Sequence, residues 1–273
     1  MTRNFPLSEG ARGGPARRPN LTKAESRLVM SLHRRKARET ERLFLAEGVR
    51  VAEELAASTI DLVFSVVSTA LEDTPRGRTV ADALGRRAPV HRVTDAALRQ
   101  LAATDTPQGV LAVARIPESS LEEVVARPGH VLVGDAVQDP GNLGTLVRIA
   151  DAFAASGVVL LPGTVDAWNP KVVRASAGSS FHLPIVESSL DALLESCRQA
   201  GIRMVGADAS GVPINSVEIG RTALVVGNEG AGLTPATRDA IDQTVSIVMP
   251  GNTESLNVGV AAGILFYLIT VRE

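Results

Sequence analysis

The sequence predicts an α/β protein of two domains, in which strands and helices alternate along the chain. The chain has 273 residues, 45% of them hydrophobic, which is enough for one large core or two modest ones. Short apolar runs of strand length alternate with stretches of helical periodicity from residue 21 onward. Several later strands are followed by loops of glycine and small polar residues, which is typical of the C-terminal ends of a parallel sheet.

Composition divides the chain into four segments. Residues 1–20 are rich in glycine, proline and arginine and almost lack apolar side chains, so they predict a disordered basic tail. Residues 21–115 predict a small α/β domain, and residues 116–129 a linker or a short bridging helix. Residues 130–273 predict a second α/β domain, whose parallel sheet is covered by helices on both faces.

Periodicity and capping signals place the elements of the first domain. Thr22 and Glu25 have the spacing of a capping box, and a basic helix is expected from there to about Arg38. Apolar alternation predicts the rest: strands at 44–46, 61–67, 90–93 and 110–114, and helices at 47–57, around 81–84, and from Thr94 to 101.

The second domain shows the same alternation. Asn142 and the pair Ser188 and Asp191 are candidate N-terminal caps, and Thr234 with Pro235 marks a helix start. The expected strands are 131–134, 158–161, 183–186, 202–207, 223–227 and 245–249, and the expected helices are 142–155, 171–177, 188–200, one from 234, and an apolar helix within 256–271.

Charge is distributed unevenly along the chain. The net charge is −2, but residues 1–42 carry 11 Lys and Arg against 4 Asp and Glu. Such a segment attracts polyanions such as RNA, although a solvated tail without a partner explains the same pattern. Within it, Arg34, Arg35, Lys36 and Arg38 are candidate contacts for RNA phosphates.

Cysteine and apolar content indicate a cytoplasmic protein. The single cysteine, Cys197, excludes an internal disulfide and is read as a small buried apolar side chain. Residues 1–20 lack the apolar core of a signal peptide. The apolar run 256–271 has 16 residues, which is short for a membrane span and suits a buried helix.

Three polar loops that follow predicted strands carry the candidate chemistry. The first leads into a helix and contains Asn142 and, six residues on, Arg148. The second has three glycines in six residues, with Glu229 as its ionisable group. The third opens onto the terminal helix and contains Ser255 and Asn257. Glycines and small polar residues at helix starts present backbone amides that can bind a polar ligand.

Other common sites are excluded by spacing. The chain has neither the dinucleotide fingerprint G-x-G-x-x-G nor a phosphate loop, and no G-x-S-x-G elbow occurs. The four histidines, at positions 33, 91, 130 and 182, lack metal-ligand spacing, so no metal is expected. Aromatic residues make up only 3% of the chain, so base stacking is not expected to be the main way of holding RNA.

The three loops, in this order and spacing, resemble the motifs of the SpoU/TrmH family of RNA ribose methyltransferases, which have the knotted SPOUT fold. The motifs correspond to residues 139–150, 226–233 and 247–262. The segment 169–178, with Lys171 and Arg174, is similar to the family's connecting region. Residues 43–115 resemble the ribosomal-protein-like RNA-binding domain that precedes many such catalytic domains.

The resemblance implies methyl transfer from S-adenosylmethionine to a ribose 2′-hydroxyl, a homodimer, and a trefoil knot through which the C-terminal segment is threaded. It implies that Lys171 and Arg174 contact RNA. Ribosomal RNA is the expected substrate because of the accessory domain, with tRNA as the alternative. The implied cofactor-binding residues are Gly206, Ala207, Val226, Gly227, Ile247, Met249, Ser255 and Leu256.

The implied catalytic residues are Arg148, Asn142, Glu229, Ser255 and Asn257. The family's mechanism makes the first a general base, but a guanidinium keeps its proton at neutral pH. We therefore expect Arg148 to orient the ribose and stabilise a developing alkoxide, held by the other four, and the general base stays open. Gly259 departs from the family, which usually has a second serine there. An RNA-binding protein without catalysis and a nucleotide hydrolase are the rival classes.

Overall fold

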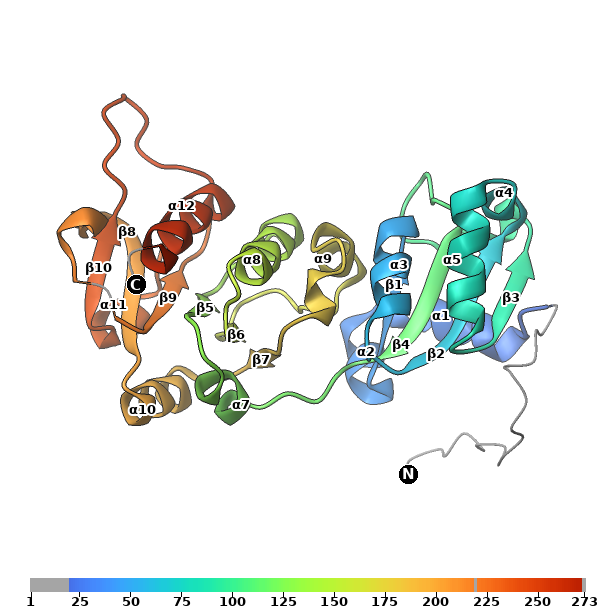
Figure 1. The fold of residues 1–273 in the computed structure, drawn as a ribbon, viewed down its shortest axis with the longest axis horizontal. Coiled ribbons are helices and arrows are strands. Elements are labelled where there is room, and N and C mark those ends of the chain that lie inside the picture. The colour runs from blue at the N-terminus through green and yellow to red at the C-terminus, as the bar shows by residue number, and fades with distance from the viewer. Residues whose placement is uncertain (1–19, 219, 272–273) are drawn as a thin grey trace.

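The computed structural model describes residues 20–218 and 220–271. Two sheets organise these residues, and Figure 1 shows them side by side along the long axis of the molecule. The expected basic tail lies outside the described residues, apart from Asn20. The predicted fold class, a parallel-sheet domain preceded by a separate small α/β unit, is confirmed.

The N-terminal sheet has four strands in the order β1-β4-β2-β3. Strand β4 is antiparallel to both of its neighbours, whereas β2 and β3 are parallel. Alternate residues of β4 enter two cores on opposite faces, which explains why its sequence is continuously apolar. The strands are β1 (Leu43–Glu47), β2 (Leu62–Ser68), β3 (Val90–Val93) and β4 (Val110–Arg115).

Helices cover both faces of this sheet (Figure 1). On one face lie α1 (Lys23–Leu32) and α6 (Asp95–Leu101); on the other lie α3 (Val49–Ala57), α4 (Thr69–Glu72) and α5 (Pro75–Gly85). The Thr22–Glu25 capping box of α1 and the Thr94 cap of α6 are confirmed.

The C-terminal sheet has six strands, all parallel as the sequence predicts, and their order is β10-β8-β9-β5-β6-β7. They are β5 (Val131–Gly134), β6 (Gly157–Leu160), β7 (Ile185–Glu187), β8 (Arg203–Pro213), β9 (Thr222–Val226) and β10 (Gln243–Ser246). The last strand ends three residues earlier than expected, and a long loop then connects it to the terminal helix (Figure 1).

Helices pack on both faces of this sheet. The first face carries α8 (Pro140–Ala152) and α12 (Val258–Thr270), and the second carries α7 (Leu121–Ala126) and α10 (Leu190–Ala200). The short α11 (Pro235–Ala240) lies between Leu233 and Ile241, which both pack in the second core. The expected linker thus contributes a helix to the second core. Cys197 is buried there, and burial raises the pKa of its thiol to about 11, which agrees with an inert apolar role.

Two predicted caps are wrong by a few residues. Asp139, and not Asn142, caps α8: its Oδ1 accepts from the Asn142 N–H at 2.8 Å, and Pro140 occupies the first helical position. Ser189, and not Ser188, caps α10, since its side chain accepts from the Ala192 N–H. The true cap thus lies three residues before the predicted residue in the first case and one residue after it in the second.

The basic helix expected to reach Arg38 is broken after residue 32. Helix α1 ends there, and α2 (Arg35–Glu41) follows as a separate short helix. Arg38 explains the break, because its Nη1 donates to the Leu32 carbonyl at 2.8 Å. That carbonyl is freed where α1 ends, so an arginine replaces the next helical hydrogen bond.

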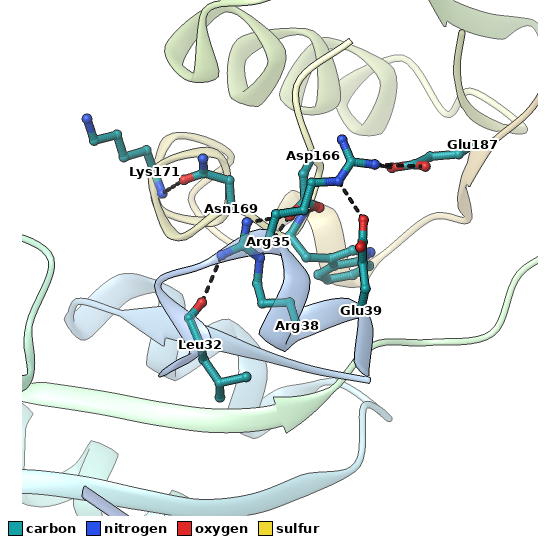
Figure 2. Close-up of polar contacts among 9 residues, drawn as sticks. Leu32, Arg35, Arg38, Glu39, Asp166, Asn169, Lys171 and Glu187 are labelled. Atoms are coloured by element: carbon teal, nitrogen blue, oxygen red, sulfur yellow. Dashed lines mark hydrogen bonds and ion pairs between the residues drawn. The ribbon is translucent and has the colours of Figure 1, made fainter. Parts of the chain in front are cut away.

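Arg38 also joins the two sheet units. Its Nε donates to Asp166 Oδ2 at 2.8 Å, and Figure 2 shows this pair between α2 and the segment before α9 (Pro170–Ala175). Trp168 of the same segment packs on Phe44 of β1, with ring centroids 4.7 Å apart. Arg38 is therefore a structural residue, and its expected role as an RNA contact is wrong.

We expect Arg38→Ala to destabilise the protein by about 3–5 kcal/mol, because it leaves the Asp166 carboxylate, only 12% exposed, without its cationic partner. Urea unfolding measures this loss. The matched control is Arg35→Ala, which breaks ion pairs to Glu39 and Glu187 with side chains about half exposed or more. That change should cost no more than about 1 kcal/mol. Equal losses for the two variants would contradict the assignment.

Candidate active site

A cavity of about 350 Å³ lies at the ends of strands β9 and β10 and beside the middle of β8, which runs on to Pro213, beyond the expected end at residue 207. This is the edge at which a parallel sheet binds ligands. Seven of the eight residues predicted to bind the cofactor line it: Ala207, Val226, Gly227, Ile247, Met249, Ser255 and Leu256. Gly206 is the exception. A Cβ there would meet Leu233 and Ile241 at 2.6 and 2.5 Å, so this residue faces the helices of the opposite face.

The second polar loop forms one wall of the cavity as a tight turn. The backbones of Asn228 and Gly232 exchange hydrogen bonds of 2.8 and 2.9 Å. The Asn228 side chain closes the turn, since its Oδ1 accepts from the N–H groups of Gly230 and Ala231 at 3.0 Å each. At Gly227 a Cβ would lie 2.2 Å from the Gly232 carbonyl carbon, so only glycine allows this approach.

We expect Gly227→Ala to abolish binding of a ligand in this cavity, because the added methyl group must displace the backbone of Gly232. The matched control is Gly230→Ala in the same turn, where the nearest atom to a new Cβ is Asn228 Oδ1 at 3.8 Å. Calorimetry with S-adenosylmethionine compares the two. Similar affinities for both variants would show that the close approach is not required.

A chain of hydrogen bonds joins the three polar loops beside the cavity. Asn142 Nδ2 donates to Glu229 Oε1 at 2.9 Å, and Asn257 Nδ2 donates to Asn142 Oδ1 at 3.0 Å. Asn257 also caps α12, since its Oδ1 accepts from the N–H of Gly259 at 2.9 Å. Three loops that lie far apart in the sequence are thus fixed to one another by side chains predicted to act together.

Glu229 is held as a carboxylate. Burial alone would raise its pKa, but hydrogen bonds from Asn142 and from the backbone N–H groups of Gln138 and Asp139 outweigh burial and lower the pKa below its usual value. A carboxylate with a lowered pKa is a weak proton acceptor. Glu229 therefore suits a positioning role better than that of a general base.

Arg148 and Ser255 lie outside this hydrogen-bonded chain. Both side chains are exposed. Across the described parts of the chain, the Arg148 guanidinium has neither a hydrogen bond nor an ion pair, so the expectation that four polar residues hold it in place is wrong within one protomer. Asn142 and Glu229 satisfy each other instead, since they face each other across adjacent loops.

The unusual Gly259 has a packing reason. Helix α12 lies against α8, and a Cβ at position 259 would approach Thr145 Cγ2 to 2.8 Å. A serine there would push the two helices apart unless Thr145 moved. The departure from the family pattern therefore accompanies a close contact between the helices.

Asp208 and Arg238 also line the cavity, although no sequence motif indicates them. They form an ion pair of 2.6 Å. A hydrogen bond from the Ser210 hydroxyl is the main reason that the pKa of Asp208 is lowered, and Arg238 adds to it. The position of Asp208 directly after the expected strand 202–207 could have indicated it, by the same rule that indicated the other loops.

The remaining candidate RNA contacts differ in whether their charged groups are free to bind phosphate. Arg34, Lys36 and Lys171 are exposed and make no ion pair within the region that the structure describes. Figure 2 shows the Lys171 side chain extending away from the Arg38 cluster. Arg35, by contrast, is engaged by two carboxylates. Arg174 is half-buried.

Comparison with known proteins gives the same assignment. The model of the SpoU rRNA Methylase family matches residues 129–267, and that of the MRM3-like substrate binding domain matches residues 26–112. Fold and loops together define the class of RNA 2′-O-ribose methyltransferases that use S-adenosylmethionine. The chain belongs to the SpoU rRNA methylase family, and the resemblance inferred from its loops is confirmed.

The similar proteins include curated and solved examples. The 23S rRNA (guanosine(2553)-2′-O)-methyltransferase RlmP of Bacillus subtilis is 37% identical over 238 residues, covering 86% of this chain and 92% of its own. The structure of the SpoU methyltransferase AviRb from Streptomyces viridochromogenes with AdoMet has a TM-score of 0.82 and 29% identity, covering 92% and 98% of the two chains. An AdoMet-bound rRNA methyltransferase from Sinorhizobium meliloti has a TM-score of 0.79 and 28% identity, covering 93% and 97%.

A helix must be both long and apolar to span a membrane. Among residues 20–218 and 220–271, no helix combines the length and the apolar content needed to cross a bilayer. The terminal helix α12 has 13 residues.

Proposed function

We propose that this protein transfers the methyl group of S-adenosylmethionine to a ribose 2′-hydroxyl of ribosomal RNA. The observation that carries the proposal is the hydrogen-bonded chain of Glu229, Asn142 and Asn257, which joins three loops around one cavity. The relative RlmP is named as a methyltransferase of 23S rRNA, so this is the first RNA to test.

The cavity fits the proposed cofactor in its chemistry. Val226, Ile247 and Leu256 supply an apolar wall suited to an adenine ring. Asp208, Glu229 and Arg238 supply groups of both charges, which suit a ligand that itself carries both. Gly227 allows the backbone to approach closely. The bound cofactor supplies an electrophilic methyl group on a sulfonium.

The proposed roles of the residues follow from where they lie. Asn142, Glu229 and Asn257 fix the loops, so that the acceptor ribose meets a preformed site, and such positioning supplies much of the lowering of the barrier. Ser255 lines the cavity from the third loop and contacts the nucleotide. The Arg148 guanidinium, which has no partner within the described residues, binds the ribose phosphate and stabilises the negative charge that develops on the 2′-oxygen.

We propose a homodimer formed through α12. The side chains of Val260, Ile264, Tyr267 and Val271 are between 37% and 56% exposed, and their spacing places them along one side of the helix. An apolar stripe of this kind marks an interface. We also propose the trefoil knot; the return of α12 from edge strand β10 to pack on α8 supports it.

The domain boundaries are proposed as 21–115, 116–129 and 130–273, after a tail of residues 1–20. The end of β4 at Arg115 and the start of β5 at Val131 support them. The first domain and the exposed Arg34, Lys36 and Lys171 then bind RNA, and the reaction takes place in the cytoplasm.

Mapping 2′-O-methyl groups on total RNA, with and without the gene, tests the function. One ribosomal nucleotide should lose its methyl group in the deletion strain and regain it with the gene restored. A lost methyl group in tRNA would favour the alternative substrate. No change in any RNA, together with no binding of S-adenosylmethionine in calorimetry, would favour a non-catalytic RNA-binding protein.

A further inference from the structure

A second cavity lies at the junction of the two sheet units. It encloses about 220 Å³ and shares no lining residue with the cofactor cavity. Helix α3, the loop before β4 and helix α9 all contribute to its wall. The residues that line it include Glu47, Gly48, Arg50, Thr104, Gln108 and Arg174.

The guanidinium of Arg174 is positively charged, and one of its nitrogens has no hydrogen-bond acceptor within the described residues. Its Nη1 is buried and makes no hydrogen bond, and no ion pair engages the guanidinium anywhere in the described ranges. A buried donor on a charged group costs free energy unless an acceptor satisfies it. With no protein acceptor engaged, the half-buried guanidinium is available to a ligand that accepts hydrogen bonds and carries negative charge.

The opposite wall adds positive charge from the other sheet unit. Arg50 is exposed in the first turn of α3, and this helix begins at Gly48 without any side-chain cap. Gln108 Oε1 accepts from the N–H of Val49 at 2.9 Å, which leaves the next first-turn amides without an intrahelical acceptor. The positive end of the helix dipole thus adds to the charge of Arg50.

Glu47 is the one carboxylate among the lining residues, and its oxygens are already used. They accept from the N–H of Ala103 at 2.8 Å and from the hydroxyl of Thr104. The carboxylate therefore holds the loop before β4 in place and forms no ion pair with Arg174. Two arginines and a helix N-terminus face one engaged carboxylate, so the cavity favours an anion.

We infer that this cavity binds one phosphate of the RNA backbone, held between Arg50 of the N-terminal unit and Arg174 of the C-terminal unit. The inference rests on the proposed RNA substrate. Paired guanidinium groups suit the planar, bidentate recognition of phosphate oxygens. One phosphate gripped from both sides fixes the substrate-binding domain relative to the cofactor cavity, so the site serves docking of RNA and not the chemical step.

Filter binding of in vitro transcribed 23S rRNA at several KCl concentrations tests the site. Arg50→Gln and Arg174→Gln should each weaken binding about tenfold or more at low salt. Each should also reduce the slope of the logarithm of RNA affinity against the logarithm of KCl concentration, by the amount expected for the loss of about one phosphate contact. The double variant should resemble the single variants, because both arginines hold the same phosphate. Arg198→Gln, on the distant helix α10, is the matched control and should bind as wild type.

Separate readouts distinguish the site from a structural role and from the reaction. The variants should keep the melting temperature and the affinity for S-adenosylmethionine, and they should methylate with a raised KM and an unchanged kcat. RNA affinity and salt dependence equal to wild type in Arg174→Gln would overturn the inference even if methylation is intact. Tight binding of inorganic phosphate, with unchanged RNA binding in the variants, would assign the cavity to a free anion and also overturn it. Wild-type protein that binds RNA as expected but transfers no methyl group would contradict only the proposed function.

Discussion

Replacing Arg148 with alanine should reduce methyl transfer by about 10²–10³-fold or more, the loss seen when a preorganised donor to a developing oxyanion is removed. The cavity should still bind S-adenosylmethionine with unchanged affinity, because Arg148 does not line it. Single-turnover methylation of 23S rRNA measures the first quantity and calorimetry the second. The substitution should not destabilise the fold, since the exposed side chain has no partner within the described residues.

Arg148→Lys refines the same test. A lysine keeps the charge but loses the planar fork, so activity should recover only in part if two hydrogen bonds to the ribose phosphate are needed. Arg198→Ala on α10 is the control for loss of surface charge. Turnover close to wild type in Arg148→Ala would remove this arginine from the mechanism.

The site was predictable from sequence to the extent that it depends on where strands end. Polar residues after a parallel strand meet at one edge of the sheet, which is why Glu229, Asn142 and Asn257 were identified together before their hydrogen bonds were known. Gly206 was misassigned because it is the neighbour of Ala207 within β8, and only Ala207 faces the cavity. Successive residues of a strand point to opposite faces, so an error of one position reverses the direction.

The junction of the two sheet units could not be predicted in the same way. The Arg38–Asp166 pair joins residues 128 positions apart, and nothing local distinguishes Arg38 from the exposed arginines beside it. A charge run predicts an RNA-binding surface only if its side chains stay in solvent. The break between α1 and α2 turns the Arg38 side chain inward to the Leu32 carbonyl. The hydrophobic periodicity of the sequence does not indicate this break.

Deleting residues 255–273 should abolish both cofactor binding and dimerisation. The deletion removes Ser255 and Leu256 from the cavity wall, and with Asn257 it removes the hydrogen bond to Asn142. It also strips buried side chains of α12 from the core. Leu265, Phe266 and Ile269 are at most 1% exposed, and each contributes roughly 1.5–3 kcal/mol of burial. Calorimetry and sedimentation should therefore report both losses together; loss of only one would disprove the link.

Because so large a deletion also removes part of the core, a surface variant must separate the interface from the fold. Ile264→Glu with Tyr267→Glu places two charges on the exposed stripe of α12 and leaves its buried side unchanged. Such charges are costly in an apolar interface, so sedimentation should show a monomer while the melting curve stays cooperative. Val212→Glu, at an exposed position on β8, is the matched control and should remain dimeric. If the double variant remains a dimer, the stripe is not the interface, and the terminal helix then acts on the cofactor cavity alone.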